Sequence, residues 1–527
     1  MLPHVLVPVI FAGLTSHWMF NKLEPRALLH FILLLALPPT LLVPLVIRHM
    51  SNVLHAILFT YCLYLLSLMT SVATYRLSPF HPLAQYPGPV LCKLTKLYLA
   101  GISMGGKQHL YYSELHRRFG DVVRIGPNEL SFRDVNAIIP MMGSKGMPKG
   151  PCTRRAWNRA FSTSALKDYE VVVDNRVSQF VDILGTKLGA PVDISQRLGW
   201  LTFDIMNDVM FSAGGDTMKY EDREDTSRLL RNAQPMALLM AHLPWFSEIY
   251  LWLPCIGQGL RSFRKYASER VSERKARGCN QMDVFYHLID EGGLEPHAPS
   301  HAQILSDGGL AIIAGSETTS TTLSHIIWFL ICHPKAYLRL QAEIDDPKNN
   351  SGVPASQARM PYLNAVINEA LRIFPAVLSG SQRAPRIDSG GQSIGYHFVP
   401  EGTSTVVHTY SLHHDPRYFS PLPDAFIPER WLSSEEQLAL EPELFGDKKN
   451  VFRHNTAAFI PFSIGPSNCV GRNLAYQEMR MVICSLMSKF DMRFEKGFDV
   501  GSWEESILDY FVVQRGRLPV ILTARNT

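Results

Sequence analysis

The stretch Phe462-Ser-Ile-Gly-Pro-Ser-Asn-Cys-Val-Gly471 places one cysteine, Cys469, in a loop punctuated by glycine. Gly465 and Gly471 allow the backbone angles of a tight hairpin, which can point N–H groups at the sulfur. A helix-like run follows at once, from Arg472 to Lys489. We expect the positive end of this helix to lie near the sulfur and to lower the pKa of the thiol. A lone buried cysteine is more often inert, but this context predicts a thiolate that binds a metal.

These ten residues resemble the haem-binding loop of the cytochrome P-450 family, Phe-x-x-Gly-x-Arg-x-Cys-x-Gly, at every fixed position but one. The resemblance implies haem b as cofactor, with Cys469 as the axial ligand of the iron and with Phe462, Gly465 and Gly471 shaping the binding loop. A thiolate ligand pushes electron density onto the iron and favours O–O cleavage. The departure is Ser467, which stands where the family has an arginine that helps to bind a haem propionate. We therefore expect other residues to anchor the propionate, or haem to be held less tightly.

A second motif, Ala314-Gly-Ser-Glu-Thr-Thr319, lies inside the long apolar pattern 304–332. It resembles the oxygen-binding segment of the family's central helix. The resemblance implies that Gly315 leaves room for O2 and that Glu317 and Thr318 are the catalytic residues. An acid next to an alcohol can relay the protons that O–O cleavage consumes. The alternative is that Glu317 and Thr318 are ordinary helix-surface or capping residues.

A third motif, Glu369-Ala-Leu-Arg372, places a carboxylate and a guanidinium on one face of a helix. Such pairs are common, so the motif is weak alone. The stretch Phe426-Ile-Pro-Glu-Arg430-Trp follows it before the cysteine loop. The resemblance implies that Arg430 joins Glu369 and Arg372 in a buried network, since a carboxylate between two guanidinia suits bidentate pairing. We interpret these three residues as structural.

Two arginines resemble the family's propionate ligands. Arg154 lies seven residues before Phe161, as in the family's third helix, although Gly150 replaces the aromatic or histidine that usually stands four residues earlier. Arg383 follows the Glu-x-x-Arg helix at the place of a second such ligand. The alternative for each arginine is an exposed salt-bridge partner.

The first 85 residues predict a membrane anchor. Their apolar runs are 4–20, 27–47 and 53–75. The last two are long enough to cross a bilayer of ~30 Å, and the first is marginal. The runs leave open either three spans or one span, 53–75, with two interfacial helices. We expect the anchor to end at Tyr86-Pro-Gly-Pro89, because proline stiffens the chain.

Charge predicts the orientation of this anchor. Lys22 and Arg26 lie between the first two runs, Arg48 alone lies between the last two, and several basic residues follow the third. A three-span path with the N-terminus in the lumen puts the richer basic segments in the cytosol. We expect the membrane of the endoplasmic reticulum, with a catalytic domain, 86–527, facing the cytosol.

The remaining chain predicts a mainly α fold with small β-sheets, the cytochrome P-450 fold, as one domain. Helical patterns cover 107–119, 171–187, 225–241, 258–277, 304–332, 334–346, 359–373 and 471–488, and strand-like pieces cover 121–126, 129–132, 402–408 and parts of 507–523. The net charge of +4 is modest and does not indicate that the protein binds nucleic acid. The eight cysteines show no paired or metal-like spacing, which favours a reducing compartment around the catalytic part.

The resemblance implies a monooxygenase that inserts one oxygen atom from O2 into a lipophilic small molecule. Its electrons would come from a separate NADPH-cytochrome P-450 reductase. Segments that line the family's substrate pocket are apolar and rich in methionine here, which favours a terpenoid or another lipophilic substrate. Asn158-Arg-Ala-Phe161 and His413-His-Asp-Pro-Arg417 resemble fungal members of secondary metabolism. Two alternatives remain: a haem-thiolate isomerase or dehydratase, and a non-enzymatic haem-binding relative.

Overall fold

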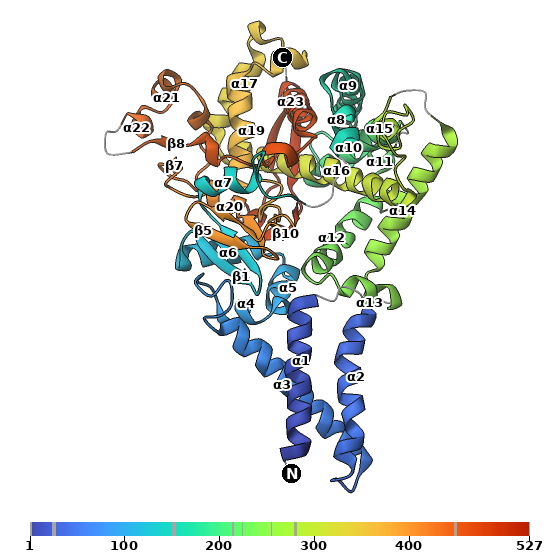
Figure 1. Cartoon of the computed structure of the whole chain (residues 1–527). Coiled ribbons are helices and arrows are strands. Elements are labelled where there is room, and N and C mark those ends of the chain that lie inside the picture. The colour runs from blue at the N-terminus through green and yellow to red at the C-terminus, as the bar shows by residue number, and fades with distance from the viewer. Residues whose placement is uncertain are drawn as a thin grey trace.

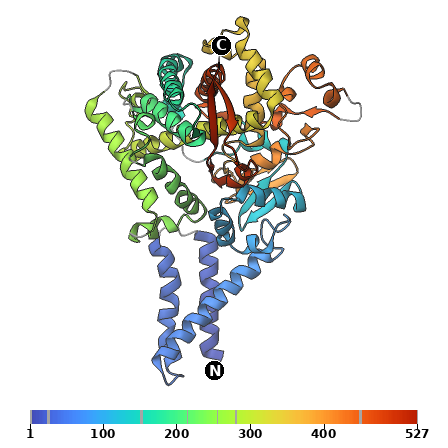
Figure 2. The same ribbon diagram turned by 180° about the vertical axis from the view of Figure 1, so that it is seen from behind.

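A computed structural model describes residues 3–23, 28–149, 154–212, 215–223, 225–253, 256–278, 282–446 and 451–525. Three N-terminal helices extend from one end of a larger, mainly helical body, and the C-terminus lies at the opposite end (Figure 1). The view from behind shows the same arrangement, with the N-terminus at the tip that is farthest from the body (Figure 2). The expected fold class, mainly α with small sheets after N-terminal apolar helices, is confirmed.

Most of the chain is helical. The α-helices are α1 Pro3–Leu23, α2 Leu28–Ile47, α3 Val53–Leu77, α4 Val90–Leu94, α5 Lys96–Met104, α6 Gln108–Phe119, α7 Val135–Met142, α8 Arg154–Ala160, α9 Thr163–Gly185, α10 Ile194–Phe211, α11 Thr217–Tyr220, α12 Thr226–His242, α13 Phe246–Trp252, α14 Gln258–Arg277, α15 Val284–Leu288, α16 His301–Cys332, α17 Pro334–Asp345, α18 Pro354–Gln357, α19 Pro361–Ile373, α20 Thr409–His413, α21 Ser434–Leu440, α22 Pro442–Phe445, α23 Arg472–Lys489 and α24 Ser502–Ser506. Short 3-10 helices are η1 Pro347–Asn349, η2 Pro428–Trp431, η3 Thr456–Ala458 and η4 Gly465–Ser467.

The strands form small separate sheets. They are β1 Val122–Gly126, β2 Glu129–Phe132, β3 Pro191–Asp193, β4 Gly391–Ile394, β5 His397–Pro400, β6 Ser404–Val407, β7 Phe419–Ser420, β8 Arg453–His454, β9 Phe490–Phe494, β10 Leu508–Tyr510, β11 Val512–Gln514 and β12 Pro519–Ala524. Strand β2 pairs antiparallel with β1 and parallel with β6, and β12 pairs antiparallel with both β3 and β9. The sheet β1–β2–β6 supports the segment that carries Arg383, because Arg383 bridges to Thr405 of β6.

The three N-terminal helices coincide with the predicted apolar runs. Each is long and apolar enough to cross a membrane. The prolines inside α2 do not end it. All three helices contact one another, and the Tyr64 hydroxyl of α3 joins them: it lies 2.8 Å from Ser16 Oγ of α1 and donates to the Leu34 carbonyl of α2 at 2.6 Å. The helices therefore form a bundle with internal polar contacts.

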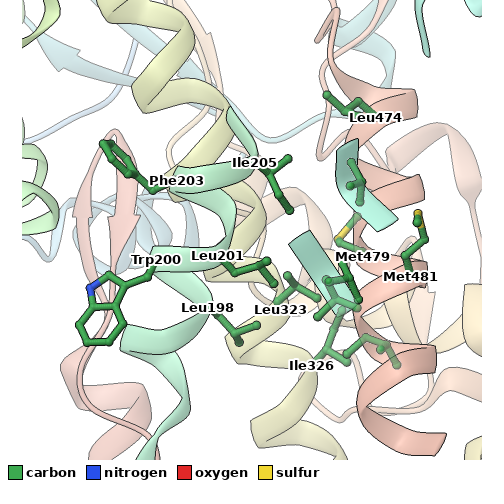
Figure 3. Close-up of a cluster of buried hydrophobic side chains, with 14 of the residues drawn as sticks. Leu198, Trp200, Leu201, Phe203, Ile205, Leu323, Ile326, Leu474, Met479 and Met481 are labelled. Carbon is green, nitrogen blue, oxygen red and sulfur yellow. The ribbon is translucent and has the colours of Figure 1, made fainter. Parts of the chain in front are cut away.

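The core of the larger body is built around α16, which packs extensively against α10. Apolar side chains of α10, α16 and α23 converge there (Figure 3). Among those drawn are Leu198, Leu201, Ile205, Leu323, Ile326 and Met479. The helix α10 was not predicted from the sequence. Almost every residue of α10 is buried, so its sequence lacks the one-sided apolar period by which a surface helix is detected.

Most other expected elements are confirmed with small shifts in their ends. The helix expected at 171–187 begins earlier, at Thr163, because the Ser162 side chain caps it by accepting from the Ala165 N–H. The polar stretch between the helices predicted at 334–346 and 359–373 contains two elements that were not predicted, η1 and α18. These corrections leave the order of the main helices unchanged.

Candidate functional site

The cysteine loop is a short 3-10 turn, η4, followed directly by α23. The Cys469 N–H donates to the Phe462 carbonyl at 2.9 Å, which closes the loop. The Phe462 ring packs on Tyr476 of α23, with the ring centroids 5.2 Å apart. Gly465 has φ +71, and a Cβ there would collide with the Met142 carbonyl oxygen, so this position requires glycine.

Gly471 differs from the expectation. It is the N-cap of α23 with φ −81 and ψ 7, a conformation that residues with a side chain can adopt. An added Cβ would meet only the Phe161 ring, at an ordinary 3.7 Å. The conformational freedom that we expected at both glycines is therefore used at Gly465 but not at Gly471. Its backbone N–H does hydrogen-bond to the Cys469 sulfur, as expected for this hairpin.

Cys469 is accessible to solvent, although it lies among many protein atoms. A residue that is both accessible and surrounded lines an internal space. Burial raises the pKa of the Cys469 thiol, and the Gly471 N–H and the positive charge of Arg154 only partly offset this. The expectation of a lowered thiol pKa is thus wrong for the protein chain alone. Coordination to a metal would itself deprotonate the thiol.

The middle of α16 carries an accessible strip on an otherwise buried helix. Leu310 and Ala314 are exposed, and Thr318 is half-buried, at intervals of four residues that share one helix face. The Thr318 hydroxyl donates to the Ala314 carbonyl at 2.7 Å. Glu317, one position earlier, is buried. Adjacent helix positions point about 100° apart, so the acid and the alcohol face different spaces.

Gly315 has a different role from the one expected. A Cβ at this position would collide with the Met206 side chain of α10. The glycine thus allows α10 and α16 to pack closely. The room that we expected it to leave for O2 is instead filled by Met206, and the open strip of α16 lies at Ala314.

Arg383 fits a buried anionic group beside the cysteine loop. Its backbone N–H donates to the Thr405 carbonyl at 2.7 Å, which fixes the residue against β6. Its side chain is almost fully buried, and Nη2 lies 3.3 Å from Ser463 Oγ of the cysteine loop. Nε is buried and has no hydrogen-bond partner among the described residues. A buried donor without a partner is costly, so this nitrogen suits a ligand oxygen.

Arg154 also reaches the cysteine loop, but its donors are engaged. Nη1 donates to the Asn468 carbonyl at 2.6 Å, and Nη2 donates to Asn468 Oδ1 at 2.7 Å. Nε donates to Asn158 Oδ1 at 3.1 Å. Asn468, which precedes the cysteine directly, was not among the predicted site residues. Gly150, the other predicted departure near Arg154, lies outside the described residues.

The network of Glu369, Arg372 and Arg430 is confirmed. All three side chains have no exposed surface. Arg372 donates to both Glu369 oxygens at 2.9 and 2.8 Å, and Arg430 Nε donates to Oε1 at 3.2 Å. Although burial raises the pKa of Glu369, the two guanidinia and the Ile427 N–H bring that pKa below its usual value. The carboxylate is therefore charged and ties α19 to η2.

These residues together fit a haem group. No cluster of three or more His, Cys, Asp or Glu side chains that could hold a bare metal ion occurs in the part of the chain that the structure describes. One cysteine can hold iron only if another molecule supplies most of the other ligands, as the haem macrocycle does. The unpartnered Arg383 Nε suits a carboxylate of such a group, and accessible Cys469 suits its metal.

Arg515, which was also not predicted from the sequence, forms an ion pair with Glu317. The two residues are separated by almost 200 positions, and no local pattern marks Arg515 as a partner. The pairing depends on the β11 segment returning to α16, which only the folded chain shows.

Comparison with known proteins identifies the family. The family model Cytochrome P450 matches residues 142–515. Cytochrome P450 67 of Uromyces fabae is 30% identical over 96% of this chain and 96% of that protein. Cytochrome P450 monooxygenase nodW of Hypoxylon pulicicidum is 32% identical over 82% of this chain and 81% of that protein. Trichothecene C-15 hydroxylase of Fusarium sporotrichioides is 31% identical over 87% and 96%. The chain belongs to the cytochrome P450 family of haem-dependent monooxygenases.

Proposed function

We propose that this protein is a membrane-anchored haem-thiolate monooxygenase that inserts one oxygen atom from O2 into a lipophilic small molecule. The family uses O2 and a redox partner, and here we propose NADPH-cytochrome P-450 reductase as that partner. The observation that carries the proposal is Cys469, which is accessible inside the protein and lies in a loop closed by Phe462. Bound haem supplies the activation of O2.

We propose that Cys469 ligates the haem iron and that the loop residues Phe462, Gly465 and Gly471 hold it in place. Arg383 is the stronger candidate for a propionate ligand, because its buried Nε has no partner in the described chain. Arg154 would have to share its donors with Asn468, or exchange that residue for a propionate. Its present bonds keep the cysteine loop against α8.

Thr318 and Glu317 are the proposed proton-delivering residues. Thr318 lies on the accessible strip of α16 and can present its hydroxyl to the reacting centre. Glu317 is buried behind it and can supply the next proton.

For the substrate we propose a lipophilic secondary metabolite such as a terpenoid. The name of one relative, Trichothecene C-15 hydroxylase, supports oxidation of a secondary metabolite. Some apolar residues in the segments that line the family's substrate pocket, including Met141, Met147 and Leu378, are buried in packed cores. These residues therefore contribute to core packing, and we do not propose that they contact the substrate.

For the location we propose the endoplasmic reticulum, with the catalytic part in the cytosol and the N-terminus in the lumen. Three contacting helices support a three-span path over one span with two interfacial helices. Such a path returns the chain to the cytosolic side at Arg76, where Lys93 and Lys96 follow. This agrees with the preference of basic residues for the cytosol.

The proposed reaction is tested with the purified protein in vesicles that contain the reductase. We expect a thiolate-type spectrum after reduction and binding of CO, together with NADPH-dependent consumption of O2. A haem-thiolate isomerase would give the spectrum without needing NADPH for turnover. A non-enzymatic relative would give neither turnover nor reductase-dependent consumption of O2.

Replacing Thr318 with alanine is expected to leave haem bound while lowering the amount of product per NADPH by at least about ten-fold. A positioned proton donor contributes roughly 10²–10⁴-fold, and without it electrons end in free hydrogen peroxide. The measurement is the ratio of product and peroxide to NADPH consumed. Thr322→Ala is the matched control, because its hydroxyl also bonds to the carbonyl four residues earlier, at 3.1 Å. If the amount of product per NADPH is unchanged in Thr318→Ala, Thr318 has no role in proton delivery and is an ordinary residue of the helix.

Replacing Ser467 with arginine tests whether haem is weakly anchored. If a propionate lacks a donor, Ser467→Arg should slow the loss of haem to apomyoglobin about ten-fold or more, since a hydrogen bond to a charged group contributes roughly 1.5–3 kcal/mol. Ser467→Ala, which removes the hydroxyl without adding charge, should match the wild type. If Arg383 already satisfies the propionates, the added arginine finds no free partner, and an equal or faster loss would reject weak anchoring.

A further inference from the structure

Glu317 points away from the accessible strip of α16 and toward Arg515. Its side chain is 8% exposed, and its Oε2 lies 3.4 Å from Arg515 Nη1. This distance is at the long end for a hydrogen bond, so the contact is mainly the attraction of two charges. Among the described residues, Arg515 is the hydrogen-bond partner of this carboxylate. The carboxylate is therefore held on one side only.

Arg515 is held much more firmly than Glu317. Its Nε donates to Ser324 Oγ at 3.0 Å, and Nη1 donates to Thr321 Oγ1 at 2.8 Å, both on α16. Nη2 donates to the Ser195 carbonyl of α10 at 3.3 Å. Because these acceptors do not depend on Glu317, the guanidinium can stay in place when the carboxylate turns away.

A small polar cavity lies beside this ion pair. Its volume is about 20 Å³, and Glu317 and Arg515 form part of its wall. The rest of the wall includes Ser195, Ser227, Arg231 and Gln514. A cavity of more than about 10–15 Å³ with two to four polar partners can hold a water molecule. We expect one ordered water here, next to the carboxylate.

The cavity connects Glu317 with the surface of the protein. Gln196, which also lines it, is exposed to solvent. The opposite wall is fixed, because Gln514 Nε2 of β11 donates to the Arg231 carbonyl of α12 at 2.7 Å. Helices α10 and α12 and strand β11 thus enclose a short polar route from solvent to Glu317.

We propose that Arg515 is a positioning residue that holds the Glu317 carboxylate at this cavity, where it takes up a proton from solvent before turning toward Thr318. This inference rests on the proposed role of Glu317 and Thr318. In each cycle the O–H bond of a hydronium ion in the cavity breaks and an O–H bond forms on Glu317. Glu317 then passes that proton to the Thr318 oxygen, while Thr318 releases its own proton to the oxygen atom of O2 that leaves as water. One proton moves inward, and no electron passes through these residues.

Arg515→Gln tests the proposal, because glutamine keeps neutral hydrogen bonding but removes the charge that attracts Glu317. The probe is O2 itself, reduced with NADPH in vesicles that contain the reductase, so that no substrate needs to be known. We expect the ratio of hydrogen peroxide to water formed to rise by about ten-fold, less than the roughly 10²–10⁴-fold that a positioned proton donor contributes, because the variant keeps Glu317 and changes only its position. The solvent isotope effect in D2O should rise as well. Arg515→Lys, which keeps the charge, should restore most of both values.

A second measurement requires no turnover. The carboxyl infrared band that disappears in Glu317→Gln belongs to Glu317. In Arg515→Gln this band should shift in frequency, because the carboxylate has lost its charged donor, whereas haem content should stay at the wild-type level. Loss of haem in Arg515→Gln, without recovery in Arg515→Lys, would indicate a purely structural role and overturn the proposal.

Arg525→Gln is the matched control. Arg525 is also largely buried, and it pairs with Asp345 at 2.6 Å and with the Met487 carbonyl at 2.7 Å, but it does not line the cavity. We expect wild-type values for this variant. If Thr318→Ala and Glu317→Gln change the peroxide ratio while Arg515→Gln does not, the inference about Arg515 fails alone. If none of the three changes it, the proposed proton delivery itself fails.

Discussion

Replacing Cys469 with alanine is expected to abolish haem binding through sulfur and with it the thiolate-type CO spectrum. The alanine side chain offers no ligand, and the Gly471 N–H and the Phe462 carbonyl would enclose a loop without a metal-binding atom. Enzyme activity should fall to background. The measurements are the reduced CO difference spectrum and the haem-to-protein ratio of the purified membrane protein.

Cys484→Ala is the control for this experiment. Cys484 lies on α23, the same helix that follows the loop, but it is buried, and burial raises the pKa of its thiol to about 12. A buried thiol that resists ionisation is a poor metal ligand, so this variant should keep the spectrum. A thiolate-type spectrum in Cys469→Ala that is lost in Cys484→Ala would move the ligand to α23.

Replacing Glu369 with alanine is expected to leave little or no haem-loaded protein. The change strands Arg372 and Arg430, which have no exposed surface. It also removes the acceptor of the Trp431 indole N–H, which now lies 2.9 Å from Oε2. Breaking a buried ion pair costs about 3–5 kcal/mol, a large part of the roughly 5–15 kcal/mol that stabilises a folded domain. Haem content and thermal unfolding measure the effect.

The surface residue Glu114 provides the matched control. It pairs with Arg117 three residues later, the same spacing as Glu369 and Arg372, but the Arg117 side chain is 72% exposed. An exposed pair contributes little to stability, so Glu114→Ala should load haem normally. Normal haem content in Glu369→Ala would contradict the structural role given to the buried network.

Local patterns predicted much of this protein. The helix after the cysteine loop begins and ends where expected, because Gly471 precedes a continuous run of helix-forming residues up to Lys489. The Glu369 network was also predicted, but through the resemblance of its two short motifs to those of the family, because the Glu369–Arg372 spacing alone is common. The three apolar runs correspond to α1, α2 and α3. They were predictable because the hydropathy of a run is a property of its own residues and does not depend on contacts with distant segments.

The remaining features depend on contacts between distant segments. The close contact with Met206 is the reason why position 315 needs a glycine, and the ion pair with Arg515 is the reason for the orientation of Glu317. No local pattern in the sequence identifies either partner. The missed helix α10 is buried on nearly all sides, so it shows no periodic pattern. The thiol pKa of Cys469 was also misjudged, because burial by surrounding chain outweighs the local helix and N–H groups.

The bundle of α1, α2 and α3 limits how the catalytic part can sit on a membrane. A domain tethered by one helix can spin about the axis of that helix and tilt freely. Here each helix contacts the other two, so the three form one bundle. The Tyr64 hydroxyl, shared between Ser16 and Leu34, helps to hold that bundle together. A base of three linked helices restricts both the azimuth and the tilt of the catalytic part, and it therefore favours one orientation of the enzyme against the lipid.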